Sequence, residues 1–242
     1  MKKELIFINK QPTETSCGPT CLKAIYDYYG HKKSLETIIK EIPALEKGGT
    51  LAVQLGIHAL KENFDVTIYT YNLQVFDPTW FMPKRLSRES IIEKLKAEQK
   101  VKHKAKLQFA CKNYIDFLEL GGSLRMADLS SRVLKKYLQN STPLLTGLSA
   151  TYLYSCSREK VVDHHQVADD VGGFPEGHFV ILDDYNREEK RVRIVDPYPG
   201  NPYSKDLCYA IRMEKLINAI LLGVMTYDAN FMVIRPKSCK LK

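Results

Sequence analysis

The sequence lacks any long apolar run. No stretch approaches the roughly 18 consecutive apolar residues that a membrane helix needs, and the N-terminus leads only into the short apolar stretch from Leu5 to Ile8. That stretch is too short for the core of a signal peptide. We therefore expect no membrane partner, and a cytoplasmic protein whose thiols stay reduced.

The cysteines lack a pattern. None of the six forms a CxxC pair and their spacing is irregular, so neither a zinc knuckle nor a redox motif is indicated. With 44% hydrophobic and 26% charged residues, the composition is that of an ordinary globular chain, and 242 residues bury enough apolar surface to fold without disulfides. We predict one domain over residues 1–242 and no cofactor. The cysteines are Cys17, Cys21, Cys111, Cys156, Cys208 and Cys239.

Positive charge is concentrated in one segment. The chain carries a net charge of +8, and residues 84–112 hold ten basic and three acidic residues, a local charge of +7. The alternation of Lys100, Lys102, Lys104 and Lys106 suits an exposed edge strand or loop, and a solvated surface is the leading interpretation. An acidic substrate is the functional alternative. Nucleic acid is not favoured, because aromatic residues do not interleave with the charges.

The first third of the chain shows mainly helical spacing. From Cys17, apolar residues recur every three or four positions until Gly30, where a helix is expected to stop. Pro19 fits the first turn, where its missing N–H costs nothing. Further predicted elements are a strand at Leu5–Asn9, a helix from Ser34 to before Pro43, a helix from Gly48-Gly49-Thr50 to about Glu62, and a strand at Val66–Tyr71.

Residues 72–142 differ from what flanks them. They read as a helical insertion, a possible lid or substrate-recognition subdomain, with Ser90-Ile-Ile-Glu93 as a capping box and an amphipathic helix at 130–138. After Pro143 the chain returns to strands. Helices followed by an antiparallel sheet predict the α+β class. The later elements are strands at Leu144–Tyr154, His178–Leu182, Arg191–Val195 and Phe231–Ile234, and a helix at Met213–Leu222.

Cys17 is the candidate nucleophile. A cysteine nucleophile needs a thiolate, a base for its proton and donors for the oxyanion that forms on attack. Unpaired N–H groups and the positive end of the dipole at a helix start favour a thiolate. Gln11 lies on the preceding turn, where its amide can donate beside the Cys17 N–H. The alternative is that Cys17 is a small core residue, as Cys21 one turn later is expected to be.

His178 and Asp196 are the candidate base and its orienting acid. His178 opens one predicted strand and Asp196 closes the next, so an antiparallel pairing brings these two ends together. Asp183 and Asp184 are rival orienting acids, ranked lower because they follow His178 on its own strand. A structural histidine and a plain Asp-Pro turn are the alternatives to a catalytic pair.

A second polar cluster suggests metal binding at first sight. It consists of Asp163-His164-His165 with Asp169-Asp170. Adjacent histidines on an extended segment point in opposite directions, and the spacing matches no common zinc or calcium loop. We interpret it as a polar loop beside the substrate cleft and expect no metal.

Three segments together resemble the C39 peptidase and C39-like family: Gln11-(x5)-Cys17-Gly18-Pro19-Thr20, Gly177-His178-Phe179-Val180-Ile181 and Val195-Asp196-Pro197. The resemblance covers about residues 5–71 and 143–236. It implies a papain-like fold with Cys17 as nucleophile, His178 as general base, Asp196 as orienting acid and Gln11 as oxyanion donor.

The implied activity is hydrolysis of a peptide or isopeptide bond through a thioester. Acyl transfer to an amine, as in the related phytochelatin synthases, uses the same site, and some domains of this family bind peptides without cutting them. The sequence leaves these alternatives open, together with the oligomeric state.

Overall fold

A seven-stranded sheet forms the centre of the molecule. The computed structural model describes residues 5–45, 49–162 and 165–237. The strand order is β2-β1-β9-β3-β6-β7-β8, and each ladder is antiparallel except the parallel pair β1 and β2. The predicted class, helices packed on a mainly antiparallel sheet, is confirmed. The strands are β1 (Phe64–Thr70), β2 (Ser123–Arg125), β3 (Leu144–Ser149), β6 (Gly177–Asn186), β7 (Arg191–Val195), β8 (Cys208–Arg212) and β9 (Asn230–Pro236).

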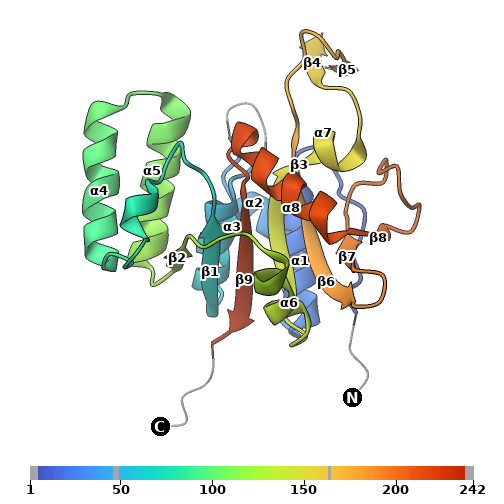
Figure 1. The fold of residues 1–242 in the computed structure, drawn as a ribbon, viewed down its shortest axis with the longest axis horizontal. Coiled ribbons are helices and arrows are strands. Elements are labelled where there is room, and N and C mark those ends of the chain that lie inside the picture. Colours follow the sequence, from blue (N-terminus) through green and yellow to red (C-terminus); the bar gives the residue numbers. More distant parts are fainter. Residues whose placement is uncertain (1–4, 46–48, 163–164, 238–242) are drawn as a thin grey trace.

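Helices cover both faces of this sheet (Figure 1). On β6, Phe179 and Ile181 pack into the same core as α1, whereas Val180 and Leu182 pack into the core that contains α8. A strand covered on both faces reads as a continuous apolar run, which explains this part of the sequence. The covering helices are α1 (Cys17–Tyr28), α2 (Leu35–Glu41) and α3 (Ala52–Lys61) on one face, and α6 (Ser131–Leu138), α7 (Ala150–Tyr154) and α8 (Met213–Leu222) on the other.

The first helices begin and end at the residues that the sequence indicates. α1 begins at Cys17, and Gly30 follows its end with a φ of +73°, a conformation that glycine adopts without strain. Ser34 caps α2, since its side chain accepts a hydrogen bond of 3.1 Å from the backbone N–H of Thr37. These predictions are confirmed.

Two predicted strands are wrong. Residues 5–9 form no ladder; the Asp183 carboxylate accepts a hydrogen bond of 2.9 Å from the Ile6 N–H, so a side chain replaces a neighbouring strand as partner. The strand expected at 144–154 ends at Ser149, whose hydroxyl accepts a bond of 3.3 Å from the Tyr152 N–H and starts the short helix α7. Local capping there overrides an apolar pattern that suits either structure.

Residues 72–142 form two long helices, a short one and an edge strand. The hairpin of α4 (Arg88–Val101) and α5 (Ala105–Glu119) follows the turn η1 (Pro78–Trp80). The predicted capping box at Ser90 is wrong, because Ser87 one turn earlier accepts the bond from the Ser90 N–H. Phe117 of α5 packs against Gly56 of α3, so the hairpin shares the main core.

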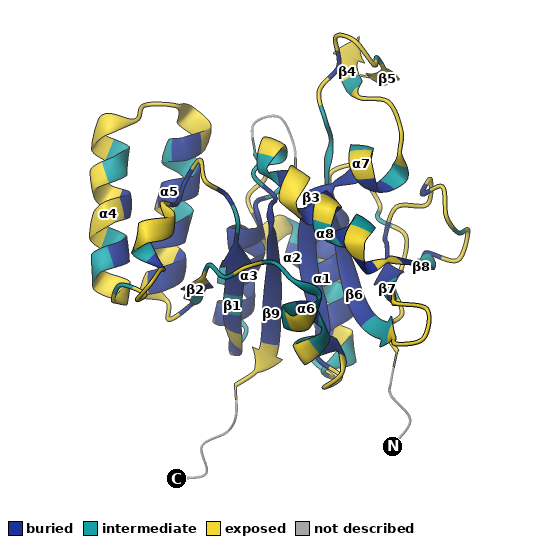
Figure 2. Ribbon diagram, viewed as in Figure 1, coloured by how far each residue is buried: buried dark blue, intermediate teal, exposed yellow. Residues whose placement is uncertain are grey.

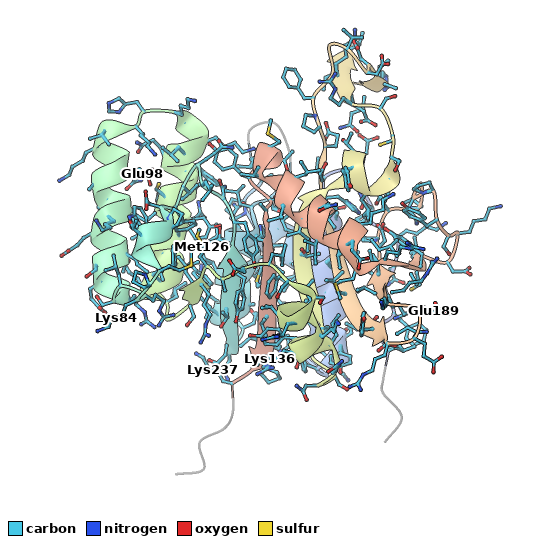
Figure 3. All side chains as sticks on the ribbon, in the orientation of Figure 1. Lys84, Glu98, Met126, Lys136, Glu189 and Lys237 are labelled. Carbon is cyan, nitrogen blue, oxygen red and sulfur yellow. The ribbon has the colours of Figure 1, made fainter. Side chains whose placement is uncertain are left out.

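The alternating lysines surround the loop between α4 and α5. Lys102 and Lys104 flank the gap between the two helices, while Lys100 and Lys106 lie in the adjoining turns. The loop interpretation is therefore correct for the middle of the series. Figure 3 shows side chains projecting from both helices of this hairpin, at the edge of the molecule.

A small hairpin that the sequence did not predict projects from the body. It consists of β4 (Glu159–Val162) and β5 (His165–Ala168) and is mostly exposed, unlike the buried strands of the main sheet (Figure 2). It lies between α7 and β6, directly before the segment that leads to His178. Within the described ranges, no helix is both long and apolar enough to cross a bilayer.

Candidate active site

Cys17 lies at the first residue of α1, where backbone donors remain available. The preceding Ser16 side chain donates to the Thr13 carbonyl at 2.9 Å and accepts from the Thr13 N–H at 3.0 Å, and it does not cap the helix. Pro19 has no N–H to contribute. A Cβ at Gly18 would lie 2.7 Å from the Thr50 hydroxyl, so only glycine lets the helix start pass this close to Thr50.

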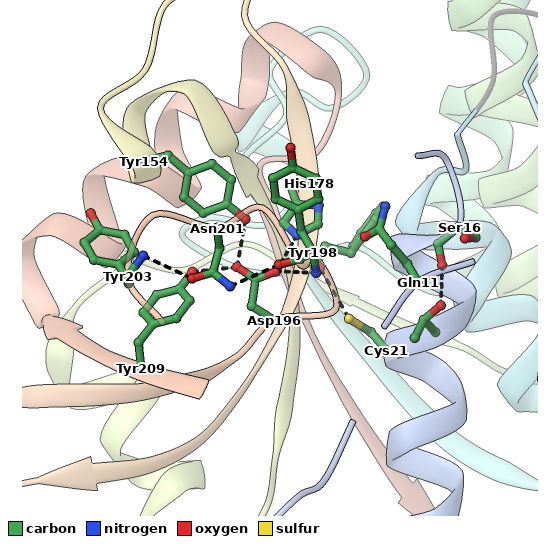
Figure 4. A network of polar contacts seen from close by, with 12 residues as sticks. Gln11, Ser16, Cys21, Tyr154, His178, Asp196, Tyr198, Asn201, Tyr203 and Tyr209 are labelled. Atoms are coloured by element: carbon green, nitrogen blue, oxygen red, sulfur yellow. Dashed lines mark hydrogen bonds and ion pairs between the residues drawn. The ribbon is translucent and has the colours of Figure 1, made fainter. Parts of the chain in front are cut away.

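His178 and Asp196 meet where the start of β6 lies beside the end of β7, as the hairpin argument predicts. β6 runs away from His178 and β7 returns, with Ile181 in register with Val195. The His178 Nε2 lies 2.8 Å from the Asp196 Oδ1, and both residues are buried. Figure 4 shows this contact with the surrounding polar side chains. Nδ1 is thus the ring nitrogen that Asp196 leaves available, and the Cys17 side chain lies near enough to raise the pKa of this imidazole.

The Asp196 carboxylate is fully enclosed and has several donors. Its Oδ2 accepts hydrogen bonds of 2.7 Å from the hydroxyls of Tyr154 and Tyr209, and its Oδ1 accepts one of 3.0 Å from the Tyr198 N–H (Figure 4). Burial alone would raise the pKa of Asp196, but the hydrogen bond to His178 and the other donors hold it below the ordinary value. The carboxylate therefore stays charged at neutral pH.

The imidazole of His178 is held in its protonated form. Burial alone would lower its pKa, but the adjacent Cys17 and Asp196 side chains raise the pKa of His178 to about 10. A histidine that is protonated at neutral pH can give a proton to a departing amine. The same side chain becomes a base once that proton has left.

Gln11 lies beside this pair but its amide is engaged locally. The Gln11 backbone N–H donates to the Pro197 carbonyl at 2.9 Å, which fastens the N-terminal segment next to Asp196. The side-chain nitrogen donates to the carbonyls of Thr13 at 2.9 Å and Glu14 at 3.2 Å, while Oε1 is buried and has no partner among the residues that the structure describes. The turn thus brings Gln11 to the site with both amide hydrogens in use.

Two site residues escaped the sequence reasoning. Tyr154 and Tyr209 come from α7 and β8, 42 and 13 residues from Asp196 in the chain. No local motif marks them, and a strand at 208–212 was not expected. Cys21, predicted to be core, is fully buried and donates to the Phe179 carbonyl at 3.3 Å.

The other acidic candidates have different partners. Asp183 accepts from the Ile6 N–H and pairs with Arg193, and it lies on β6 five residues beyond His178. Asp169 closes a turn by accepting from the N–H groups of Val171 and Gly172, and it pairs with Lys160 at 2.7 Å. Asp163 and His164 lie outside the described residues.

One group among the described residues could hold a metal ion, and the sequence did not suggest it. Glu41, His58 and Glu62 bring their ligand atoms within 4.8 Å of one another. The Lys33 ammonium lies 2.6 Å from a carboxylate oxygen of each glutamate. The chain therefore supplies its own cation where a metal would bind.

Solved structures align with this chain at low sequence identity. The peptidase domain of Streptococcus ComA, a bifunctional ABC transporter in a quorum-sensing pathway, aligns with a TM-score of 0.47 and 11% identity, over 96% of this chain and 100% of that one. A putative C39-like peptidase from Bacillus anthracis gives 0.49 and 13%, over 95% and 94%. Xylellain, a cysteine protease from Xylella fastidiosa, gives 0.41 and 14%, over 94% and 82%.

Sequence comparison covers most of the chain with a single family. No curated protein matches. The model of the Peptidase_C39 like family matches residues 4–216, a range that contains Gln11, Cys17, His178 and Asp196. The chain therefore belongs to the Peptidase_C39 like family.

Proposed function

We propose that this protein is a cysteine peptidase that hydrolyses a peptide or isopeptide bond through a thioester on Cys17. The observation that supports this most is the imidazole of His178, which is hydrogen-bonded to the buried Asp196 and whose pKa is raised by the adjacent Cys17 side chain. A nucleophile, a proton carrier and an orienting acid in this order are the parts that acyl transfer by cysteine requires.

The chemistry follows from the proton on His178. The Cys17 thiolate attacks the substrate carbonyl carbon, a C–S bond forms, and the Cys17 N–H at the start of α1 donates to the oxyanion. The His178 imidazolium then protonates the departing amine as the C–N bond breaks. In the second half, neutral His178 takes a proton from water, the water oxygen forms a C–O bond to the acyl carbon, and the C–S bond breaks. The Cys17 thiolate and the His178 imidazolium are then both regenerated.

Gln11 is the second oxyanion donor in this proposal. Its amide nitrogen already serves two carbonyls, so donation to substrate requires that the longer bond, 3.2 Å to Glu14, be exchanged for a bond to the oxyanion. The exchange costs little, because one charge-assisted hydrogen bond replaces one neutral bond.

Residues 72–142 are proposed as a substrate-recognition element. The Lys106 ammonium on α5 donates to the Thr226 carbonyl at 3.2 Å and lies over the Tyr227 ring. This contact fixes the basic hairpin against the segment that precedes β9. In this proposal, the positive charge of the hairpin attracts acidic groups of the substrate to that part of the molecule.

Alkylation of the thiol tests the proposal before any substrate is known. Limiting iodoacetamide at pH 6, followed by peptide mapping, should modify Cys17 ahead of the other cysteines, and His178→Ala should abolish that lead. A Cys17 that reacts no faster than the exposed Cys156 would contradict the proposal. Peptide libraries then give the product: a free acid supports hydrolysis, whereas an amide made with an added amine identifies acyl transfer. Cys17→Ala is the inactive control.

A further inference from the structure

A pocket lies between the β1–β2 side of the sheet and α6. It encloses about 380 Å³, a volume in the range of sites for small ligands, and its walls come from four parts of the chain. Tyr69 belongs to β1, Arg125 ends β2, Lys136 lies on α6, and Arg85 lies in the loop before α4. In Figure 1 the segment 126–130 passes in front of β1 and β9 on its way to α6.

This pocket is separate from the candidate dyad. Tyr69 faces Phe231 of β9, and Phe231 faces Thr146 of β3. Thr146 in turn faces Val180 of β6. Tyr69 therefore lies three strand spacings, about 14 Å, from the strand that carries His178. An inference about this pocket does not depend on the proposed function.

Three cations line the pocket and no acidic side chain does. They are Arg85, Arg125 and Lys136. Within the described ranges of the chain, none of the three forms an ion pair with a carboxylate. Asp128, three residues after Arg125, is exposed and does not line the pocket. Positive charges that are gathered in one place repel one another, so an anion bound between them is stabilised.

The position of Arg85 is fixed by the backbone of β2. Its Nη1 donates to the carbonyl of Leu124 at 3.3 Å, directly before Arg125 in the chain. A guanidinium carries five N–H donors, so this bond leaves most of the group for a ligand. Guanidinium groups bind phosphate oxygens through paired hydrogen bonds, which an ammonium does not form.

Two tyrosine hydroxyls supply a further donor. The hydroxyl oxygens of Tyr69 and Tyr137 lie 2.9 Å apart, and the bond between them uses only one of their two hydrogens. Burial and the neighbouring Tyr69 raise the pKa of Tyr137 to about 12, so this hydroxyl keeps its hydrogen at neutral pH. The Arg235 guanidinium, 5.5 Å from the centre of the Tyr137 ring, adds positive charge beside the pair.

The rest of the wall is apolar. Phe81, Met126 and Val133 line it, so the pocket offers a hydrophobic surface next to its cations. We propose that this pocket binds a small phosphate monoester with an apolar or aromatic body, whose phosphate lies among the three cations. The phosphate supplies two negative charges and several acceptor oxygens, and the body covers the apolar wall. A concave site of this volume takes one such group and not a nucleic-acid strand.

The test is a titration of the full chain with phenyl phosphate, followed through ¹³C-labelled methionine methyl groups. The Met126 methyl resonance should shift, whereas that of Met225, on the other side of the molecule's helical layer, should not. Inorganic phosphate lacks the body and phenol lacks the charge, so each should bind about tenfold more weakly or worse. If phenyl phosphate leaves Met126 unshifted up to about 10 mM, the inference is wrong.

A matched pair of variants separates this pocket from general positive charge. Arg125→Gln should weaken phenyl phosphate binding about tenfold. Arg132→Gln, an exposed position on α6 that does not line the pocket, should leave the affinity unchanged. Equal weakening in both variants would overturn the inference. Arg85→Gln serves if Arg125→Gln does not fold, and an unchanged affinity there would also contradict it.

Two larger probes identify the source of the phosphate. AMP that binds at least as tightly as phenyl phosphate supports a small ligand. A peptide with a phosphorylated tyrosine that binds more tightly than both would assign the pocket to a phosphorylated protein and overturn the small-ligand inference. Because these measurements record binding and not Cys17 chemistry, a negative result here leaves the peptidase proposal intact, and the failure of that proposal leaves the pocket intact.

Discussion

Two buried histidines in this molecule each contact a carboxylate, and they respond in opposite ways. His178 lies 2.8 Å from Asp196 and has its pKa raised to about 10. His58 on α3 lies 3.0 Å from Glu41, yet burial, together with the nearby charge of Lys33, lowers its pKa. Contact between imidazole and carboxylate therefore does not by itself make a reactive pair. Burial lowers the pKa of both rings; the Cys17 and Asp196 side chains outweigh it at His178, whereas Lys33 adds to it at His58.

Removing each carboxylate in turn should give the largest contrast. Asp196→Asn should lower the rate of peptide hydrolysis about a hundredfold or more, because the ring loses the acid that fixes its tautomer and charge. Glu41→Gln should leave the rate unchanged, since no step of the proposed mechanism uses His58. Steady-state hydrolysis by both variants measures this. Equal losses would show that the two clusters act together and that the comparison is mistaken.

The two histidines should also make the free energy of unfolding change with pH in opposite directions. The folded-state pKa of His178 lies above the unfolded value of 6.5, so its stabilisation is complete below 6.5 and is lost as the pH rises towards about 10. The folded-state pKa of His58 lies below 6.5, so its protonation costs stability as the pH falls below that value.

Urea unfolding at a series of pH values measures how the free energy of unfolding changes with pH on the alkaline and on the acid side. His178→Gln should flatten the decline in the free energy of unfolding between pH 7 and 10. His58→Gln should flatten the decline on the acid side, below pH 6.5. A His178→Gln protein whose stability still falls as steeply above pH 7 would show that another group carries this dependence.

The smallest expected effect concerns the lysine. Lys33→Met removes the cation between Glu41 and Glu62, so the pKa of His58 should rise, while the free energy of unfolding should fall by about 1 kcal/mol. NMR titration of the ring and urea unfolding check the two parts. Lys40→Met is the matched control, because its pair with Glu36 on α2 is exposed and should change neither quantity measurably. A His58 that titrates as before would remove Lys33 from the explanation.

The sequence was sufficient to predict those features whose hydrogen-bond and packing partners lie within a few residues along the chain. The start of α1, the stop at Gly30 and the cap at Ser34 depend on contacts within a few residues, and they were predicted. The meeting of His178 and Asp196 followed from one hairpin between consecutive strands of the sheet. Their catalytic roles, with those of Cys17 and Gln11, stay a prediction.

Longer-range contacts were beyond the sequence. Tyr154 and Tyr209 reach Asp196 from elements that have no motif, and the apolar run before Tyr154 reads equally as strand or helix. The burial of Asp228 against Gly147 and Gly177 also depends on strands that lie far from it in the sequence. Residues 5–9 alternate in burial as a strand does, but the Ile6 N–H bonds to the Asp183 side chain and not to a strand backbone.

The position of β9 has a consequence for the order of events during synthesis. The last described strand lies in the middle of the sheet, between β1 and β3, and it joins the half that carries the basic hairpin to the half that carries His178. A nascent chain that has not yet reached residue 230 cannot close the sheet, and contacts across such distances form late. The two halves of the sheet therefore join only when the last described strand inserts between them.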